Sequence, residues 1–479
     1  MTNPLLATDS YKQSHFKQYP PEARIISAYA EARPNSFSEN LLFFGLQAYL
    51  KKTLLKPITA ADIEQAEKIC AAHGVPFNRE GWQQILNDYG GLFPLEIKAL
   101  PEGTVVPSGV PLVQVENTDE RMPWLTTWVE TGLLRALWYP TTVATMSFKC
   151  KQAIYQGLLE TSDDPDAQIP FKLHDFGARG VSSAESAALG GMAHLVNFAG
   201  TDTMEALEAA TVFYGADMAG FSIPAAEHST MTSWGREREQ EAFANMLDQF
   251  AEPGKLVAVV SDSYDLDNAV ENLWCGLLKE KVLQSGATLV IRPDSGDPVE
   301  TPLRVLETLW AHYGGTVNSK GARVLNPAIR VIQGDGMTLA TISQLVGNLV
   351  SCGWSVDNIA FGMGGGLLQH VNRDTMRFAL KANAMKSADG VWQDVFKMPA
   401  TDPGKASKAG RQAVVLENGV LTARRLDDLA GEDDLLKVVY RNGELIRDWS
   451  FDEVRQRAQQ HLLERTSGSS DDKLIPGAE

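Results

Sequence analysis

At 479 residues the chain is longer than one ordinary domain, so two or three domains are expected. Hydrophobic residues make up 44% of the sequence and charged residues 22%, as in a typical globular protein with a large core. The formal net charge of −17 argues against nucleic acid or an anionic membrane as the main partner. An acidic protein that handles phosphate groups must therefore gather its Lys and Arg residues locally.

The cysteines and the first residues indicate where the protein works. The four cysteines are scattered, without a C-x-x-C pair or metal-ligand spacing, which is typical of buried thiols in a reducing compartment. The N-terminus lacks the basic and apolar regions of a signal peptide. The longest apolar stretch, around residues 41–50, is too short to span a bilayer and contains Gln47. We therefore expect a cytoplasmic protein that has no membrane partner.

The first third of the chain combines helical and strand patterns. Residues 63–73 have the apolar spacing of a helix. Residues 95–115 contain short β-rich runs that are separated by Pro-Glu-Gly and Pro-Ser-Gly turns. From 124 to 159 the pattern is helical again. These features predict a mixed α/β domain over residues 1–150.

Between residues 151 and 385, short apolar runs repeatedly end in a polar or glycine-rich cluster. The runs are 255–260 before "SDSYD", 287–291 before "RPDSGDP", 328–333 before "GDG" and 358–361 before "GMGGG". Amphipathic helical patterns follow, for example at 298–312 and 339–350. A repeated order of strand, polar tip and helix predicts a parallel α/β sheet, either doubly wound or closed. The chemically distinctive tips favour an irregular βα barrel.

The chain changes character again beyond residue 386. Strand-like pieces return at 413–416 and 436–440. We expect 386–479 to join the N-terminal region in a second, discontinuous mixed α/β domain. The tail from about residue 466 is predicted to be mobile.

Three aspartates each follow a predicted strand: Asp262, Asp294 and Asp335. Helix capping is the ordinary explanation for any one of them. Three carboxylates at the rim of one sheet can instead hold Mg²⁺ together with substrate phosphates, or bind sugar hydroxyls. The sequence does not show which residues would ligate a metal.

Basic residues stand near these tips. Arg179 follows "HDFG", Arg292 precedes Asp294, and Arg373 is expected within a helix. Three lysines come next in the chain: Lys381, Lys397 and Lys405. Arg binds phosphate oxygens in pairs and Lys supplies a point charge, although solvated salt bridges are the alternative for any single Lys.

Two further features are weaker. The glycine-rich run 362–366 precedes a helix expected near Leu367, so its amides can face an anion, but a tight turn also needs glycine. It matches neither a dinucleotide fingerprint nor a P-loop. His228 has no second ligand at zinc spacing, and a triad with Asp262 and Ser263 lacks a nucleophile elbow. A lone histidine beside an apolar run is often only a core residue.

Together the motifs resemble those of nicotinamide phosphoribosyltransferases. They are "ATDSYKxxHxxQYP", "KLHDFGxRGVSS", "LVNFxGTDT", "PAAEHST", "VVSDSYD", "IRPDSG", "RVIQGDG", "NIAFGxGGGLLQ" and "VFK", from about Leu5 to Arg411. The resemblance covers most of the chain and implies a type II phosphoribosyltransferase: an irregular βα barrel with a second mixed α/β domain, forming a homodimer with shared active sites. It implies transfer of the phosphoribosyl group of phosphoribosyl pyrophosphate to nicotinamide, with Mg²⁺, and coupling to ATP hydrolysis.

The resemblance also implies roles in nicotinamide binding. Asp9 and Tyr11 of one subunit would complete the site of the other. Phe176 would stack on the nicotinamide ring, with Tyr11 on the opposite side. Asp202 would accept a hydrogen bond from the carboxamide.

The remaining roles concern phosphate and ribose. His228 would be phosphorylated by ATP and oriented by Asp262, and Asp294 would hold the ribose hydroxyls. The residues expected to bind phosphate or pyrophosphate are Arg179, His228, Arg292, Lys381, Lys397 and Lys405. Those expected at the ribose and phosphate of the product are Arg292, Asp294, Gly334, Asp335, Gly364, Gly365 and Arg373.

Two residues depart from the family pattern: Ala178 stands where animal enzymes commonly have tyrosine, and Met363 replaces a serine. Two other functions stay open. A nicotinate phosphoribosyltransferase would share the fold, but Asp202 would repel a carboxylate substrate. A nucleotide-binding protein without turnover would have no need of the His228–Asp262 pair.

Overall fold

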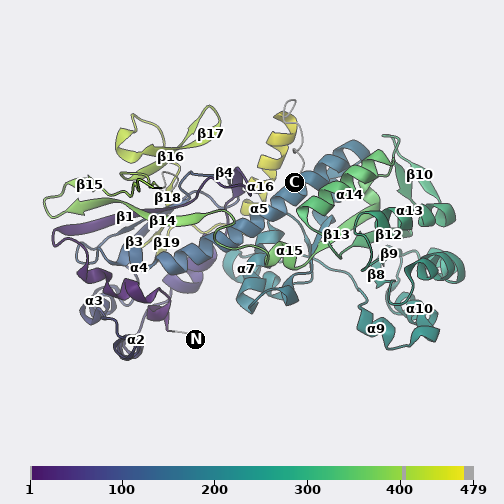
Figure 1. Cartoon of the computed structure of the whole chain (residues 1–479), viewed down its shortest axis with the longest axis horizontal. Coiled ribbons are helices and arrows are strands. Elements are labelled where there is room, and N and C mark those ends of the chain that lie inside the picture. The colour runs from purple at the N-terminus through teal and green to yellow at the C-terminus, as the bar shows by residue number, and fades with distance from the viewer. Residues whose placement is uncertain (1–2, 402–405, 469–479) are drawn as a thin grey trace. The chain divides into compact units, whose positions relative to one another are not determined.

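The computed structural model describes residues 3–401 and 406–468 of the chain (Figure 1). It divides into two compact units. The first contains Met1–Thr145, Ala210–Ala216 and Val371–His461, and the second contains Met146–Ala209, Asp217–His370 and Leu462–Glu479. Among the described residues, none of the helices combines the length and the apolar character that a membrane crossing requires.

An antiparallel sheet of seven strands forms the first unit, in the order β15-β14-β1-β5-β3-β18-β19. Its strands are β1 (Ala23–Ala32), β3 (Leu95–Ala99), β5 (Val113–Asn117), β14 (Phe378–Ser387), β15 (Trp392–Asp394), β18 (Lys437–Arg441) and β19 (Glu444–Leu445). β1 pairs with β14 from Ala23↔Ser387 to Ala32↔Phe378, so the two ends of the chain share one sheet. This pairing confirms the expected discontinuous mixed α/β domain.

Helices and hairpins surround this sheet. The helices of the first unit include α1 (Leu46–Tyr49), α2 (Ala60–His73), α3 (Arg79–Tyr89), α4 (Leu125–Trp128), the first part of α5 (Glu130–Thr161) and most of α16 (Phe451–Gly468). β2 (Asn40–Leu42) and β4 (Val105–Pro107) form a small two-stranded antiparallel sheet, and β16 (Gln412–Glu417) and β17 (Val420–Arg425) form a hairpin. Figure 1 shows α2 and α3 below the sheet and the β16–β17 hairpin above it. Thr59 starts α2 with a capping box to Asp62, as the sequence pattern of a helix start requires.

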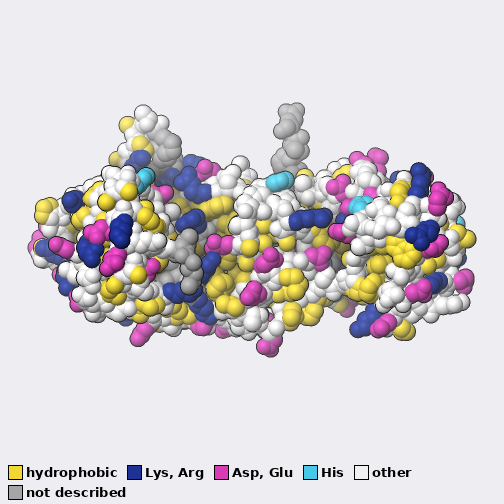
Figure 2. Space-filling view, turned by 90° about the horizontal axis from the view of Figure 1, so that it is seen from below, with side chains coloured by type: hydrophobic (Ala, Val, Ile, Leu, Met, Phe, Trp, Pro, Cys, Tyr) yellow, Lys and Arg dark blue, Asp and Glu magenta, His cyan; other side chains and the backbone are white. Residues whose placement is uncertain are grey.

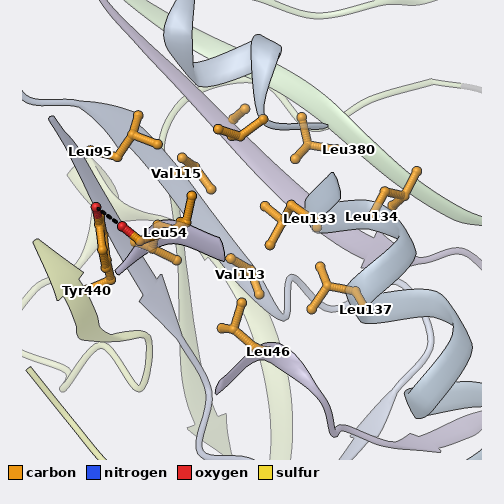
Figure 3. Packing of buried hydrophobic residues seen from close by; sticks show 14 of the residues in the cluster. Leu46, Leu54, Leu95, Val113, Val115, Leu133, Leu134, Leu137, Leu380 and Tyr440 are labelled. Carbon is orange, nitrogen blue, oxygen red and sulfur yellow. Dashed lines mark hydrogen bonds between the residues drawn. The ribbon is translucent and has the colours of Figure 1, made fainter. Parts of the chain in front are cut away.

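The core of the first unit lies between the sheet and its helices (Figure 3). Leu95, Val113 and Val115 of the strands face Leu133 and other leucines of α5, and these four named residues are fully buried. Each such side chain contributes about 1.5–3 kcal/mol through burial. The buried Tyr440 hydroxyl lies 3.0 Å from the Phe93 carbonyl and 3.4 Å from the Leu54 carbonyl, the second contact being drawn in Figure 3, so its hydrogen bonding is satisfied.

A parallel sheet of six strands forms the second unit, in the order β7-β6-β13-β12-β9-β8. The strands are β6 (Leu173–Asp175), β7 (Gly200–Thr201), β8 (Leu256–Val260), β9 (Thr288–Arg292), β12 (Ile329–Gln333) and β13 (Ile359–Met363). The longer helices are α7 (Ala184–Leu195), α8 (Met204–Tyr214, whose end belongs to the first unit), α10 (Glu239–Phe250), α13 (Glu300–Tyr313) and α14 (Leu339–Ser351). All four strands expected from the apolar runs are present, as are both expected helices.

One segment joins the two edges of this parallel sheet. Phe221 forms a parallel bridge with Gly200 of the edge strand β7, and Ala225 forms one with Ala258 of the other edge strand β8. The segment between Phe221 and Ala225 thus closes the sheet without being a regular strand. The expected irregular βα barrel is confirmed.

Some expectations need correction. β14 lies wholly in the first unit, whereas the expected boundary at residue 385 cuts through it, because β14 pairs along its length with β1. Arg373 lies in a turn and not in a helix. The side chain of Asn372 accepts hydrogen bonds from the amides of Asp374 and Thr375, which gives the backbone an alternative to helix. The tail expected to be mobile lies, beyond the end of α16, outside the described residues.

Candidate active site

The predicted site residues of the second unit lie at the carboxyl ends of the strands of its parallel sheet. Every strand contributes: Phe176 and Arg179 follow β6, Asp202 follows β7, Asp262 follows β8, Arg292 ends β9 and Asp294 follows it, Gly334 and Asp335 follow β12, and Gly364 and Gly365 follow β13. Parallel strands end at the same edge, so their buried apolar runs carry these side chains to a common rim.

Four polar residues form a connected chain at this rim. The guanidinium of Arg292 donates to both carboxylate oxygens of Asp294, at 3.1 and 2.7 Å. The backbone amide of Asp294 donates to Oδ2 of Asp262 at 3.1 Å. The other oxygen of Asp262 lies 3.0 Å from Nε2 of His228. These contacts of Asp262 and Asp294 are not those of helix caps.

His228 is held on one side and accessible on the other. It begins the short helix α9 (His228–Thr232), and its side chain is 45% exposed, whereas that of Asp262 is only 4% exposed. The buried carboxylate favours a proton on Nε2, which leaves a lone pair on Nδ1. Nδ1 lies 3.8 Å from Oδ2 of Asp294. A histidine oriented in this way can act as a nucleophile.

The ring of Phe176 lies inside the barrel mouth. Its backbone amide donates to the Met363 carbonyl at 3.0 Å, which fixes the start of the loop after β6. The ring packs on an apolar group formed by Ala258, Val290 and Ile332 with Ile223 and Ala360. The guanidinium of Arg292 lies 5.5 Å from the ring centroid. The face of Phe176 can stack on a flat heteroaromatic ring, and the guanidinium of Arg292 beside it can bind a negatively charged group next to that ring.

Asp202 is a prepared hydrogen-bond acceptor. His174 Nε2 lies 2.8 Å from its Oδ1, and the Ser222 hydroxyl donates to the same oxygen at 2.6 Å. Burial works to raise the pKa of Asp202, but the hydrogen bonds from His174 and Ser222, together with the charges of His174 and Arg292, hold it below its usual value. The carboxylate is 44% exposed and ionised. It can accept a further hydrogen bond from a ligand.

Other predicted residues of this unit have looser contacts. Arg179 is 87% exposed and lies 4.0 Å from Glu227. Asp335 is exposed, and its carbonyl accepts a hydrogen bond from Gln333. Gly364 and Gly365 begin the four-residue helix α15 (Gly365–Leu368), shorter than the helix expected there.

The remaining predicted residues belong to the first unit. Asp9 accepts a hydrogen bond from the Thr131 hydroxyl at 2.6 Å, and Tyr11 is 59% exposed. Arg373 pairs with Asp374 at 2.7 Å, and Lys397 is exposed. Lys405 lies outside the described residues.

Lys381 marks a positive region of the first unit. Burial first, and then the neighbouring charges of Arg33, Lys397 and Lys12, lower the pKa of Lys381, and Glu130 opposes this effect. Crowding of cations around this half-buried lysine, which Glu130 only partly offsets, favours the binding of an anion. Figure 2 shows acidic and basic side chains interspersed over the visible face, with several Lys and Arg side chains gathered left of its centre.

Three residues of this rim were not predicted as site residues: His174, Asp175 and Ser222. His174 and Asp175 lie in the same "HDFG" motif as Phe176, and Ser222 precedes "IPAAEHST". Asp175 could have been predicted as a site residue, because it is a charged residue at the end of an apolar strand. Nothing in the sequence pairs Ser222 with Asp202, since that contact depends on the closing segment.

Comparison with known proteins agrees with this architecture. The nicotinate phosphoribosyltransferase (NAPRTase) family model matches residues 171–444, and the model of the nicotinamide phosphoribosyltransferase N-terminal domain matches residues 3–97. The fold is shared with a nicotinate-nucleotide pyrophosphorylase from Pyrococcus furiosus (TM-score 0.60, 15% identity, 97% of each chain). It is also shared with human nicotinic acid phosphoribosyltransferase (TM-score 0.56, 17% identity, 96% of this chain and 94% of that one). Fold and charged rim thus define a phosphoribosyltransferase of the type II class.

Curated relatives narrow the assignment. A nicotinamide phosphoribosyltransferase of Xanthomonas campestris is 51% identical over 464 residues, covering 96% of this chain and 98% of the relative. That of Acinetobacter baylyi is 33% identical over 503 residues, with the same coverage of both chains. The chain belongs to the nicotinamide phosphoribosyltransferase family.

Proposed function

We propose that this enzyme transfers the phosphoribosyl group of phosphoribosyl pyrophosphate to nicotinamide, forming nicotinamide mononucleotide and pyrophosphate. The observation that carries the choice of base is the ionised carboxylate of Asp202 at the rim that also holds Phe176. It is held by His174 and Ser222 with its pKa lowered. The names of the curated relatives support the same substrate.

Asp202 favours the amide over the acid for an electrostatic reason. A carboxylate can accept a hydrogen bond from the NH₂ group of nicotinamide. Nicotinate would bring a second negative charge to the same place, and like charges in a partly desolvated site cost several kcal/mol. A site that leaves the wrong substrate unpaired discriminates strongly against it.

The reaction needs little acid–base chemistry. The pyridine nitrogen already carries a free lone pair, so no general base has to create the nucleophile. The difficult step is the departure of pyrophosphate from C1 of the ribose, which places negative charge on the leaving group. Arg292, fixed by its two hydrogen bonds to Asp294, is positioned to stabilise developing charge. Stacking on Phe176 and the hydrogen bond to Asp202 would keep the nitrogen in line with C1.

We propose Mg²⁺ as the metal cofactor of the reaction. Among the described residues no group of three or more His, Cys, Asp or Glu side chains could hold a metal ion. This finding fits Mg²⁺, which commonly takes only one or two carboxylates and binds mainly through substrate phosphates and water. Asp294 and Asp335, which follow the neighbouring strands β9 and β12, are two rim carboxylates that would hold it. The ion would neutralise charge on the phosphates.

We further propose that ATP hydrolysis is coupled to the transfer through His228. Nδ1 would attack the γ-phosphorus of ATP, releasing ADP, and water would later release phosphate from the histidine. The support is geometric: Asp262 orients the ring from its buried side, and the ring stays 45% exposed. Simple nucleotide binding would not need this pair.

We also propose a homodimer with shared active sites, in which Asp9 and Tyr11 of one subunit act in the site of the other. In support, Tyr11 is 59% exposed, and an exposed aromatic ring is free to stack on a ligand.

Turnover by the purified full-length protein tests the proposed function. Nicotinamide or nicotinate is supplied with phosphoribosyl pyrophosphate and Mg²⁺, with and without ATP, and both mononucleotides and pyrophosphate are quantified. Nicotinamide mononucleotide formed in equal amount to pyrophosphate is the expected result. Formation of nicotinate mononucleotide only would make the protein a nicotinate enzyme, and ligand binding without either product would make it a nucleotide-binding protein.

A further inference from the structure

We infer that Asp175 is a positioning residue for nicotinamide: it fixes Phe176 and Asp202 relative to each other. The inference rests on the proposed function, in which these two residues bind the ring and the amide. Asp175 is the last residue of β6 and is completely buried. It therefore does not touch substrate itself.

The carboxylate of Asp175 accepts hydrogen bonds from residues that adjoin Phe176 and Asp202 in the chain. Its Oδ1 accepts a hydrogen bond from the amide of Gly177 at 2.7 Å. Its Oδ2 accepts hydrogen bonds from the hydroxyls of Thr203 at 2.7 Å and Thr201 at 3.3 Å. Phe176 stands between Asp175 and Gly177 in the chain, and Asp202 stands between Thr201 and Thr203. Each nicotinamide contact is thus flanked by two anchored residues.

The backbone of Asp175 adds a fourth connection. Its carbonyl accepts a hydrogen bond from the amide of Asp202 at 3.0 Å, and Asp175 pairs with Thr201 in the parallel register of β6 and β7. Side chain and main chain of one residue therefore join the ends of two strands. A shift of the β6 loop would change the position of Asp202 as well as that of Phe176.

A purely structural role explains this arrangement less well. A buried carboxylate is costly unless its oxygens are fully hydrogen-bonded, and an apolar residue would fill the same space without that cost. Burial raises the pKa of Asp175, and the bonds from Thr203, Gly177 and Thr201 oppose the shift. A side chain that ends in two polar atoms can form hydrogen bonds with two loops at once, which an apolar residue cannot. What the enzyme gains for this cost is a fixed distance between Phe176 and Asp202, the two residues that bind nicotinamide.

The test measures KM for each substrate in Asp175 variants of the full-length enzyme. Asp175→Ala removes the carboxylate bonds and should raise KM for nicotinamide by about tenfold or more, with KM for phosphoribosyl pyrophosphate changed less than about twofold. Asp175→Asn should restore most of the affinity, because its oxygen can accept from Gly177 and its NH₂ group can donate to the Thr203 hydroxyl. Rescue by the amide would show that geometry, and not charge, is what Asp175 supplies.

Asn358→Ala is the matched control. Asn358 is also fully buried in the second unit, and its side chain makes three hydrogen bonds, to Leu325, Arg323 and Ser355, but it lies before β13 at the opposite edge of the sheet. It should lower the melting temperature as Asp175→Ala does, while leaving KM for nicotinamide within about twofold of wild type. If Asp175→Ala does not fold, Thr203→Val removes one of the same bonds with little change in shape and should raise KM for nicotinamide several-fold.

Three results would overturn the inference. They are equal changes in both KM values, the same nicotinamide defect in the Asn358 control, and an unchanged nicotinamide KM in folded Asp175→Ala or Thr203→Val. Failure of the proposed function has another signature: in that case Asp202→Ala and Phe176→Ala would leave KM for nicotinamide unchanged, whatever the Asp175 variants do.

Discussion

The ring of Phe176 lies directly against the backbone of Gly362 on β13. A β-carbon at Gly362 would lie 2.1 Å from Cε2 and 2.4 Å from Cδ2 of Phe176, distances that no real side chain tolerates. At Gly334, after the neighbouring strand β12, the corresponding distance to Cε2 is 3.5 Å, an ordinary contact. The aromatic ring of Phe176 therefore requires the first glycine of the run 362–366.

Replacing Gly362 with alanine should displace Phe176 and impair nicotinamide binding. We expect KM for nicotinamide to rise by about tenfold or more, because stacking needs an aligned ring, while KM for phosphoribosyl pyrophosphate changes little. Gly347→Ala is the control: Gly347 lies within α14, a β-carbon there meets nothing within 4 Å, and the change should stabilise the helix by up to about 1 kcal/mol. An unchanged nicotinamide KM in Gly362→Ala would show that the ring does not bind the base.

ATP coupling should depend on His228. We expect His228→Ala to lose substrate-dependent ATP hydrolysis, because no nucleophile remains to accept the phosphoryl group, while a slower, uncoupled transfer persists. ADP release is measured in the presence of nicotinamide and phosphoribosyl pyrophosphate. The exposed His73 on α2 provides a control, since His73→Ala should hydrolyse ATP as wild type does. ATP hydrolysis at the wild-type rate in His228→Ala would exclude a phosphohistidine at this position.

Shared sites predict complementation between inactive subunits. Tyr11→Ala and Arg292→Ala homodimers should each have little activity. Subunits mixed after mild dissociation should recover up to about a quarter of wild-type activity, since half of the dimers are mixed and each has one intact site. Tagged subunits allow the mixed dimers to be purified and assayed. Mixed dimers without recovered activity would mean that Tyr11 acts within its own subunit.

The lowered pKa of Asp202 predicts that KM for nicotinamide changes little with pH. A carboxyl with a depressed pKa stays ionised above its usual value and loses its contribution only as the pH falls through the lowered value. Nicotinamide KM should therefore show no Asp202-dependent increase between about pH 5 and about pH 8. In Ser222→Ala one supporting hydrogen bond is lost, so the increase of KM for nicotinamide at low pH should begin at a higher pH than in wild type. The claim that Asp202 is ionised would be contradicted if KM for nicotinamide in wild type rose as the pH fell from about 8 to about 5 and this rise disappeared in Asp202→Asn.

Local patterns predicted the barrel and most of its rim, because apolar runs followed by Asp, Gly or Arg mark buried parallel strands and their carboxyl ends. Long-range pairings could not be predicted. The partner of β14 is β1, far away in the chain, which is why the boundary at 385 was wrong. The hydrogen bonds of Asp175 to Thr201 and Thr203 depend on the register of β6 and β7. Arg373 was misplaced because one side chain, that of Asn372, decides its turn.

The central claim, that Asp202 selects nicotinamide, is tested most directly by the ratio of kcat/KM for nicotinamide and nicotinate at saturating phosphoribosyl pyrophosphate. We predict a wild-type preference for nicotinamide of on the order of a hundredfold or more, since each ~1.4 kcal/mol of repulsion is a factor of ten. Asp202→Ser should narrow this preference by weakening nicotinamide binding and relieving the repulsion of nicotinate. A ratio unchanged in Asp202→Ser, or a wild-type preference for nicotinate, would contradict the claim.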